Sequence, residues 1–145
     1  MTGPAKDAAM RPLSGGCQCG AVRYTIHAPP QSLYHCHCQM CCKIHGAMFA
    51  TFAVVPVAAL VIEQGADQPT TFESSPGNLR KFCGRCGCQL FCPDASRSDV
   101  ISFTPTTLDG GAHPGHAAGI ERHIYVGSKL PWYDIDSRLP QHDTY

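Results

Sequence analysis

Cys83-Gly-Arg-Cys86 holds one closely spaced pair of cysteines in this sequence, and Cys17-Gln-Cys19 near its start holds another. Each stretch places two thiols one or two residues apart, so that a single tight turn can present both to one metal ion. Zinc in structural sites takes four such ligands in a closed tetrahedron. The two pairs are therefore predicted to form a structural metal site that ties the N-terminal part of the chain to its middle.

A third cluster of thiols is Cys36-His-Cys38-Gln-Met-Cys41-Cys42. Cys36, Cys38 and Cys41 offer three thiolates from one turn, and no fourth cysteine is assigned to them. The fourth position of a metal held there is open to water or to a thiol from solution, and an open zinc ion is a Lewis acid that deprotonates a bound thiol. This cluster is the candidate site of chemistry.

Other partitions of the ten cysteines stay open at this point. Cys42, Cys88 or a histidine closes the central site in one alternative, which makes both metals structural. Cys86-Gly-Cys88 is itself a closely spaced pair, so the ligands of the first site have a second arrangement. An iron–sulfur cluster is the weaker hypothesis, because the usual ferredoxin spacings are absent. The spare thiols, Cys42, Cys88 and Cys92, are interpreted as small buried hydrophobic residues.

Composition limits the class of protein. The 145 residues suffice for one ordinary domain, and the 11 basic residues balance the 11 acidic ones, so no basic field is available for nucleic acid or for an anionic membrane. Residues 1–13 lack the apolar core of a signal peptide, and the longest apolar run, residues 47–62, is broken by Thr51 and Pro56. A cytoplasmic protein is expected, and in a reducing compartment clustered cysteines are metal ligands rather than the disulfides of a secreted scaffold.

The pattern of apolar residues predicts a mostly β fold in a single domain. Short alternating or β-branched runs favour strands, a tight or short helical turn is expected over residues 38–45, and no long helix is expected. The Ser-Ser-Pro-Gly-Asn run at residues 74–78 predicts a hairpin turn, residues 109–119 an exposed loop, and residues 130–145 an irregular segment packed in part through Trp132. The predicted strands are 22–26, 32–36, 48–55, 60–64, 70–73, 79–82, 89–92, 100–103 and 122–126.

Several segments together resemble a known family. They are Ser14-Gly-Gly-Cys-Gln-Cys-Gly-Ala-Val-Arg-Tyr, His35-Cys-His-Cys-Gln-Met-Cys, Gly77-Asn-Leu-Arg-Lys-Phe-Cys-Gly-Arg-Cys-Gly, His123-Ile-Tyr-Val and Lys129-Leu-Pro-Trp-Tyr-Asp-Ile. In order and spacing they are similar to the glutathione-dependent formaldehyde-activating enzyme family, which includes the domain of centromere protein V. The resemblance implies a zinc-binding domain over residues 14–140, preceded by a flexible lead-in, residues 1–13, and followed by a tail, residues 141–145.

The same resemblance implies a fold and two metals. The fold is a set of zinc-stapled antiparallel sheets arranged like a tent, and the relatives of the family include methionine-R-sulfoxide reductases and a Rab-binding zinc protein. Two zinc ions per chain are expected. The structural zinc ligands carried over by position are Cys17, Cys19, Cys83 and Cys86, and the catalytic zinc ligands are Cys36, Cys38 and Cys41.

The implied reaction is the condensation of formaldehyde with glutathione to S-hydroxymethylglutathione, which in reverse is a carbon–sulfur lyase reaction. Glutathione carries two carboxylates that need cationic partners, and Lys43, Arg80, Lys81 and Arg122 are candidates. The chain departs from the family pattern at Cys42-Lys43, where many members have a basic pair, and at Cys88, where a small hydroxyl residue is common. Both departures bear on which thiol is used.

The predicted substrate-binding residues are Lys43, Arg80, His123 and Trp132. His35 and His37 flank the central ligands and are candidates for hydrogen bonds to sulfur or for proton relay. The expected partners are glutathione or a similar small thiol and a small aldehyde.

Two other functions remain as hypotheses. One is a non-catalytic thiol carrier or zinc-stapled binding module. The other is a sulfoxide-reducing role, which requires a reactive thiol outside the metal sites, from Cys42, Cys88 or Cys92.

Overall fold

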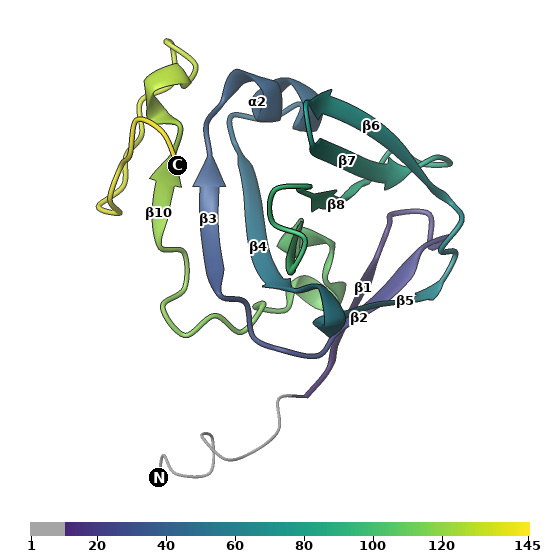
Figure 1. The fold of residues 1–145 in the computed structure, drawn as a ribbon. Coiled ribbons are helices and arrows are strands. Elements are labelled where there is room, and N and C mark those ends of the chain that lie inside the picture. Colours follow the sequence, from purple (N-terminus) through teal and green to yellow (C-terminus); the bar gives the residue numbers. More distant parts are fainter. Residues whose placement is uncertain (1–10) are drawn as a thin grey trace, which may run out of the picture.

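The computed structural model describes residues 11–145, so residues 1–10 of the predicted lead-in lie outside the described residues. The chain is mostly β and folds as one domain with two sheets, as predicted (Figure 1). The smaller sheet is antiparallel and has the order β1-β2-β5, with β1 at Leu13–Gly16, β2 at Arg23–Ile26 and β5 at Leu60–Gln64. Strand β1 was not among the predicted strands, because a stretch of Leu-Ser-Gly-Gly has no alternation of apolar and polar residues.

The larger sheet has seven strands in the order β10-β3-β4-β9-β8-β7-β6. Every pair in it is antiparallel except β10 with β3, which run parallel, so the antiparallel expectation does not hold at that edge. Strands β9 and β10 point the same way, and parallel strands need a long crossover, which residues 104–121 provide. The strands are β3 Ser32–Cys36, β4 Ala50–Pro56, β6 Pro69–Ser75, β7 Asn78–Cys83, β8 Gln89–Pro93, β9 Val100–Phe103 and β10 Arg122–Ile124.

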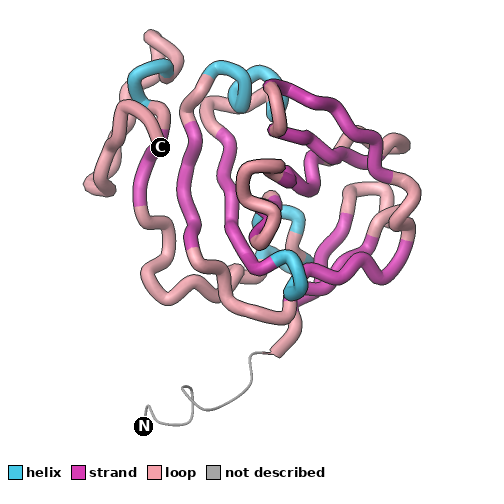
Figure 2. Tube along the Cα trace, in the orientation of Figure 1, coloured by secondary structure: helices cyan, strands magenta, loops and turns pink. Residues whose placement is uncertain are grey.

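Helical structure is confined to short pieces, as Figure 2 shows. The helix α2, Gln39–His45, begins where the Cys38 side chain accepts a hydrogen bond from the Cys41 N–H, and it ends at Gly46 in the left-handed conformation. The remaining helical turns are η1 Val57–Ala59, η2 Pro105–Thr107, η3 Asp109–Gly111 and η4 Val126–Ser128. Within the described residues, no helix is both long enough and apolar enough to cross a membrane.

Two separate hydrophobic cores support the sheets. In the first, the Tyr24 ring packs edge-to-face on Phe91 and Phe103, with ring centroids 5.4 and 5.9 Å apart, and this core also contains Cys17 and Cys83. The second core is built on β3, β4 and β10, and its members are Tyr34, Cys36, Cys41, Ala50, Phe52, Val54, Val100 and Ile124. Each group of cysteines therefore has its own core behind it.

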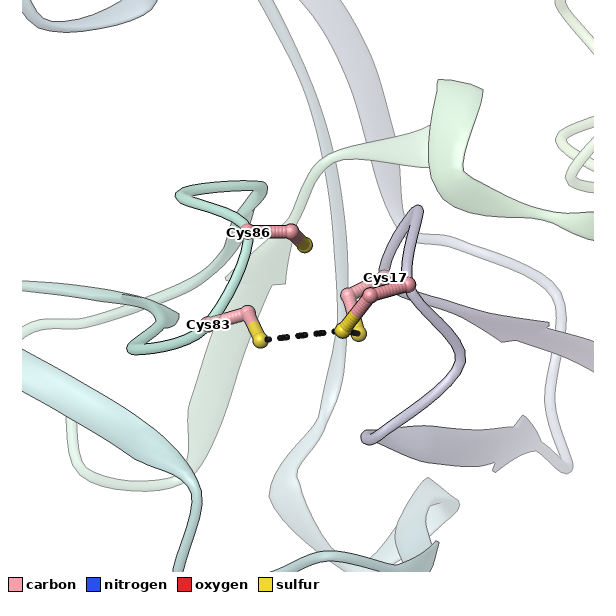
Figure 3. A group of neighbouring side chains, drawn as sticks. Cys17, Cys83 and Cys86 are labelled. Atoms are coloured by element: carbon pink, nitrogen blue, oxygen red, sulfur yellow. Dashed lines mark hydrogen bonds between the residues drawn. The ribbon is translucent and has the colours of Figure 1, made fainter.

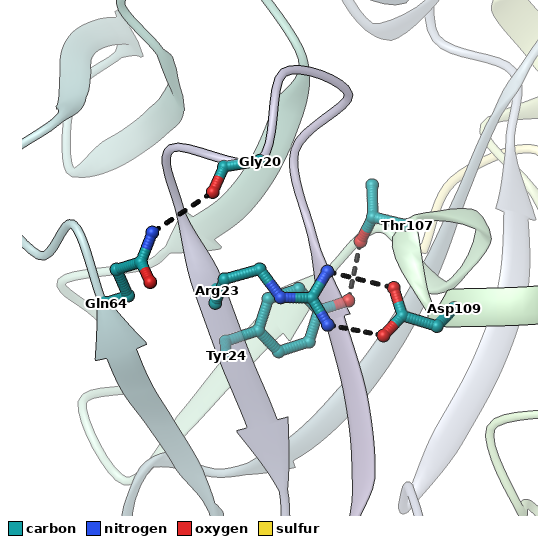
Figure 4. A network of polar contacts seen from close by, with 6 residues as sticks. All are labelled: Gly20, Arg23, Tyr24, Gln64, Thr107 and Asp109. Atoms are coloured by element: carbon teal, nitrogen blue, oxygen red, sulfur yellow. Dashed lines mark hydrogen bonds and ion pairs between the residues drawn. The ribbon is translucent and has the colours of Figure 1, made fainter.

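A polar network joins the smaller sheet to the crossover (Figure 4). Arg23 Nη1 donates to Asp109 Oδ1 over 3.0 Å, and the Tyr24 hydroxyl lies 2.6 Å from Thr107 Oγ1. Burial raises the pKa of Tyr24 to about 12, so the phenol stays neutral. The network fixes the crossover against β2.

The structure decides the burial of two segments differently. Residues 52–55 of β4 are all buried, so both faces of this strand are covered. Trp132 was expected to pack the C-terminal segment, but 69% of it is exposed. An indole in an irregular segment has no strand or helix register to turn it inward, so its size alone did not decide its burial.

Candidate metal centres and substrate cavity

Four thiols from two turns converge at the first candidate metal centre. Cys17 and Cys19 follow β1, Cys83 ends β7 and Cys86 lies in the next turn. Figure 3 shows Cys83 and Cys86 on one turn facing Cys17 on the other. The four Sγ atoms lie within 4.8 Å of one another, with 3.6 Å between Cys17 and Cys19 and 3.8 Å between Cys19 and Cys83.

These distances fit a structural zinc site. With Zn–S bonds of about 2.3 Å, the sulfurs of a tetrahedron stand about 3.8 Å apart. The site would join the smaller sheet to the end of β7, which is the staple that the spacing predicted. This group is called the quartet below.

Backbone N–H groups favour the ionised thiols that a metal needs. Val22 N–H donates to Cys17 Sγ over 3.2 Å, and Arg85 N–H donates to Cys83 Sγ over 3.4 Å. The backbone N–H groups of Cys19 and Cys88 lower the pKa of Cys86 to about 6. Metal ligands must be deprotonated, so the donors to Cys86 favour the form of this thiol that binds a cation.

Three thiols form the second candidate metal centre, called the trio. Cys36 ends β3, Cys38 caps α2 and Cys41 lies in its first turn, with the three Sγ atoms within 4.8 Å of one another. Among the described residues, no fourth cysteine, histidine or carboxylate joins this group at that distance. The Cys42 thiol, one alternative fourth ligand, instead donates to the carbonyl oxygen of Met48 over 3.2 Å.

The trio opens on a cavity of about 510 Å³, called the trio cavity. Its walls come from β3, α2, β7, β8 and the chain beyond β10, and Tyr34, Phe52, Tyr125 and Tyr145 supply aromatic surface. Catalytic zinc sites have three protein ligands and one open position, whereas structural sites are closed. Three thiols facing a cavity match the open type.

Arg80 is the buried cation at the trio. Only 8% of it is exposed, and its Nη1 and Nη2 atoms lie 3.5 and 3.4 Å from Cys41 Sγ. Its Nε donates to Ser74 Oγ over 3.0 Å. Burial disfavours the guanidinium charge, but Cys41 and the neighbouring thiols together outweigh that effect, and the pKa of Arg80 is raised. Arg80 therefore lines the trio cavity, with its charge directed at the Cys41 sulfur.

The histidines form a separate buried group beside the trio. His37 Nε2 lies 2.8 Å from His123 Nδ1, and His35 Nδ1 lies 2.8 Å from Thr51 Oγ1. Burial lowers the pKa of His35 and of His37 to about 4, and it lowers the pKa of His123 as well. None of the three histidines lines the trio cavity, and His123 is only 3% exposed.

Two of the predicted substrate residues face a different cavity. Lys43 and Trp132 line a cavity of about 500 Å³ together with Cys42 and Leu130. Met40 and Cys41 line the trio cavity instead, so the short helix α2 stands between the two. Of the four predicted contacts, the structure brings only Arg80 to the trio cavity.

Some residues of the trio cavity were not predicted. The Tyr145 ring packs against Tyr34 at 5.7 Å, and the Arg122 guanidinium lies 5.1 Å from both ring centres. Cys92 and Asp94 also line the cavity, and burial raises the pKa of Cys92 to about 11. No local sequence signal marks Tyr145, Cys92 or Asp94, because only the folding of distant segments brings them to the trio.

Comparison with known proteins identifies relatives along most of the chain. The family model described as glutathione-dependent formaldehyde-activating enzyme matches residues 12–128. A protein of Halomonas elongata named for this family is 27% identical over 133 residues, which are 87% of this chain and 82% of that protein. One of Phaeosphaeria nodorum, named likewise, is 32% identical over 75 residues, which are 52% of this chain and 40% of that protein.

A solved structure shares the fold. The crystal structure of a Rhodobacter sphaeroides protein aligns with a TM-score of 0.58 and 22% sequence identity, covering 68% of this chain and 89% of that one. At this identity the similarity concerns the fold alone.

Proposed function

The chain belongs to the glutathione-dependent formaldehyde-activating enzyme family, and from this we propose that it is a zinc-dependent carbon–sulfur lyase acting on adducts of glutathione, or a related thiol, with formaldehyde or another small aldehyde. The observation that carries the proposal is the contrast between the two cysteine groups. The quartet has the donors of a closed site, whereas the trio has three donors beside a cavity of about 510 Å³.

In this proposal Cys36, Cys38 and Cys41 would hold the catalytic zinc, and the quartet would hold the structural one. Soft thiolate ligands in a tetrahedral arrangement suit zinc among the common metals. The chemistry that a bound zinc ion supplies at the trio is stabilisation of the thiolate form of an incoming thiol at neutral pH.

The surrounding residues orient the reactants and balance charge. Three thiolates carry one negative charge more than a divalent cation neutralises. The Arg80 guanidinium, which lies beside Cys41, offsets this excess charge. The buried rings of Tyr34 and Phe52 would exclude water from one wall of the cavity, and the half-exposed Tyr145 ring would help to hold the thiol near the aldehyde.

The reaction balances without an oxidant or a reductant. The thiolate sulfur attacks the aldehyde carbon, a carbon–sulfur bond forms, and the carbonyl electron pair moves to oxygen. That oxygen takes up a proton from water, which replaces the proton that the thiol lost. The lyase direction reverses these steps and releases the aldehyde.

The test is the rate at which glutathione and formaldehyde exchange with S-hydroxymethylglutathione, measured by magnetisation-transfer NMR because the spontaneous reaction reaches the same equilibrium. The zinc-loaded parent should accelerate exchange, Cys38→Ser should lose the acceleration, and Cys42→Ser should keep it. Zinc content should fall from two ions to one per chain in Cys38→Ser only. Binding of glutathione without faster exchange would favour the carrier function and overturn the lyase.

A further inference from the structure

Most of the cationic side chains predicted to bind glutathione already have partners within the protein or face another cavity. Arg80 bonds Cys41 and Ser74, and Arg122 donates to Glu121 Oε1 over 3.0 Å while stacking between two tyrosines. Lys43 faces the other side of α2. A zwitterionic thiol in the trio cavity therefore needs charged partners other than these.

A second hollow extends the trio cavity and supplies such partners. It measures about 340 Å³ and shares Tyr34, Asn78, Asp94 and Tyr145 with the trio cavity, among other residues. Its additional wall includes Arg97, from the loop between β8 and β9. The shared walls make the two hollows one groove, with the trio in one part, Arg97 in the other and Asp94 lining both.

The loop that carries Asp94 and Arg97 is held in place by its own hydrogen bonds. Asp94 Oδ1 accepts from the N–H and the hydroxyl of Ser96 over 2.9 and 2.8 Å, and the Arg97 N–H donates to the Asp94 carbonyl over 3.0 Å. The Ala95 N–H donates to the Gly77 carbonyl over 2.9 Å, which anchors the loop to the β6–β7 hairpin. The two side chains are thus presented from a fixed turn.

Both charged groups are free to meet a ligand. Among the described residues, neither Asp94 nor Arg97 takes part in an ion pair, and no side chain accepts a hydrogen bond from the Arg97 guanidinium. The second carboxylate oxygen of Asp94 likewise has no described partner. One negative and one positive group, three residues apart on a rigid turn, complement an ammonium and a carboxylate on one carbon.

We propose that Asp94 and Arg97 form the subsite for the zwitterionic α-amino-acid end of the thiol substrate, with Arg97 binding its carboxylate and Asp94 its ammonium group. The inference rests on the proposed function, because it places the substrate sulfur at the trio. It names the substrate class as thiols that carry an α-amino-acid group, of which the γ-glutamyl end of glutathione is an example. Simple thiols such as 2-mercaptoethanol lack the groups that this subsite recognises.

The binding test uses S-methylglutathione, whose sulfur is blocked and whose amino-acid ends are intact. Calorimetry on the zinc-loaded protein should show about tenfold weaker binding in Arg97→Gln and in Asp94→Asn, since each loses one charge-assisted hydrogen bond. Asp94→Asn keeps Oδ1 for Ser96, so the turn survives. The matched control is Arg138→Gln, an exposed arginine that lines none of the three cavities.

The outcomes separate this inference from the proposed function. Parent-like binding by both variants, or no binding of S-methylglutathione to the parent, overturns the subsite, and NMR exchange in the parent still decides the lyase. Weaker binding of S-methylglutathione by both variants supports the subsite. If the parent then fails to accelerate the glutathione–formaldehyde exchange, only the proposed lyase activity is overturned. Comparing glutathione with 2-mercaptoethanol completes the test, because Arg97→Gln should impair exchange with glutathione only.

Discussion

The guanidinium of Arg80 lies 3.4 Å from the sulfur of Cys41, in a position where only 8% of the arginine is exposed. When Cys41 is ionised, as a metal ligand must be, this contact is a buried ion pair. Such a pair is costly to break from one side, because the remaining charge stays buried without a partner. Arg80 therefore bears on how strongly the trio holds a cation, and not only on what enters the cavity.

Replacing Arg80 with methionine should weaken metal binding at the trio by about tenfold to a hundredfold, the usual effect of losing a partner of a metal ligand. The measurement is Co²⁺ or Zn²⁺ affinity by chelator competition. Lys81→Met, at the half-buried next residue of β7, whose Nζ bonds Thr71, is the matched control and should keep parent affinity. Equal metal affinity in Arg80→Met and in the parent would show that the contact with Cys41 contributes nothing to the free energy of metal binding.

The two metal centres should differ in their contribution to stability. Cys83 is fully buried in the first core, and Cys83→Ser should lower the melting temperature by more than roughly 10 °C, because metal-binding free energy at a structural site is folding free energy. Cys38→Ser should have a melting temperature close to that of the parent. Thermal denaturation followed by circular dichroism, with zinc counted in each protein, checks both. A reversed order would mean that the trio, not the quartet, is the staple.

Gly65 should tolerate no side chain. Its φ is +72°, and a Cβ there would lie 2.0 Å from the backbone oxygen of Ala21. Gly65→Ala should cost about 3 kcal/mol of unfolding free energy, from backbone strain and from that clash. Gly119 has φ +66° with open space around it, so Gly119→Ala should cost only about 1 kcal/mol. Urea denaturation measures the difference, and equal costs would remove the clash as an explanation.

Tyr145 should contribute to thiol affinity through the cavity wall. Tyr145→Ala removes its packing on Tyr34 and on Arg122, and the KM for glutathione should rise about threefold to tenfold, the scale of one aromatic contact. Phe72→Ala is the matched control, because Phe72 is 55% exposed, close to the 54% of Tyr145, but lines none of the three cavities. An unchanged KM in Tyr145→Ala would exclude the ring from substrate binding.

The metal centres could be predicted from the sequence because the spacing of their ligands is local. Two thiols on one turn meet in any fold that keeps the turn, so the grouping of Cys36 with Cys38 and Cys41 needed no knowledge of the sheets. Only the grouping of Cys17 with Cys83 joined distant parts of the sequence, and it followed from the four ligands that a closed zinc site requires.

The substrate residues were harder to predict because their positions depend on register and pairing. Lys43 and Cys41 are two residues apart on α2, yet they face different cavities. His123 is held in a buried pair with His37, since β10 runs parallel to β3 and brings the two rings together. An apolar or charged residue in a sequence carries no mark of which cavity it will line.

The separation of the two cores has a consequence for how this scaffold can change over generations. The quartet packs on the core around Cys17 and Cys83, whereas the trio belongs to a different cluster, which contains Cys36 and Cys41, although β3 and β4 contribute to both. Substitutions that abolish the trio would then remove the chemistry and leave an intact domain. Proteins that descend from such a chain could acquire other functions on the same fold. The fold can therefore be conserved in evolution while the reaction is lost.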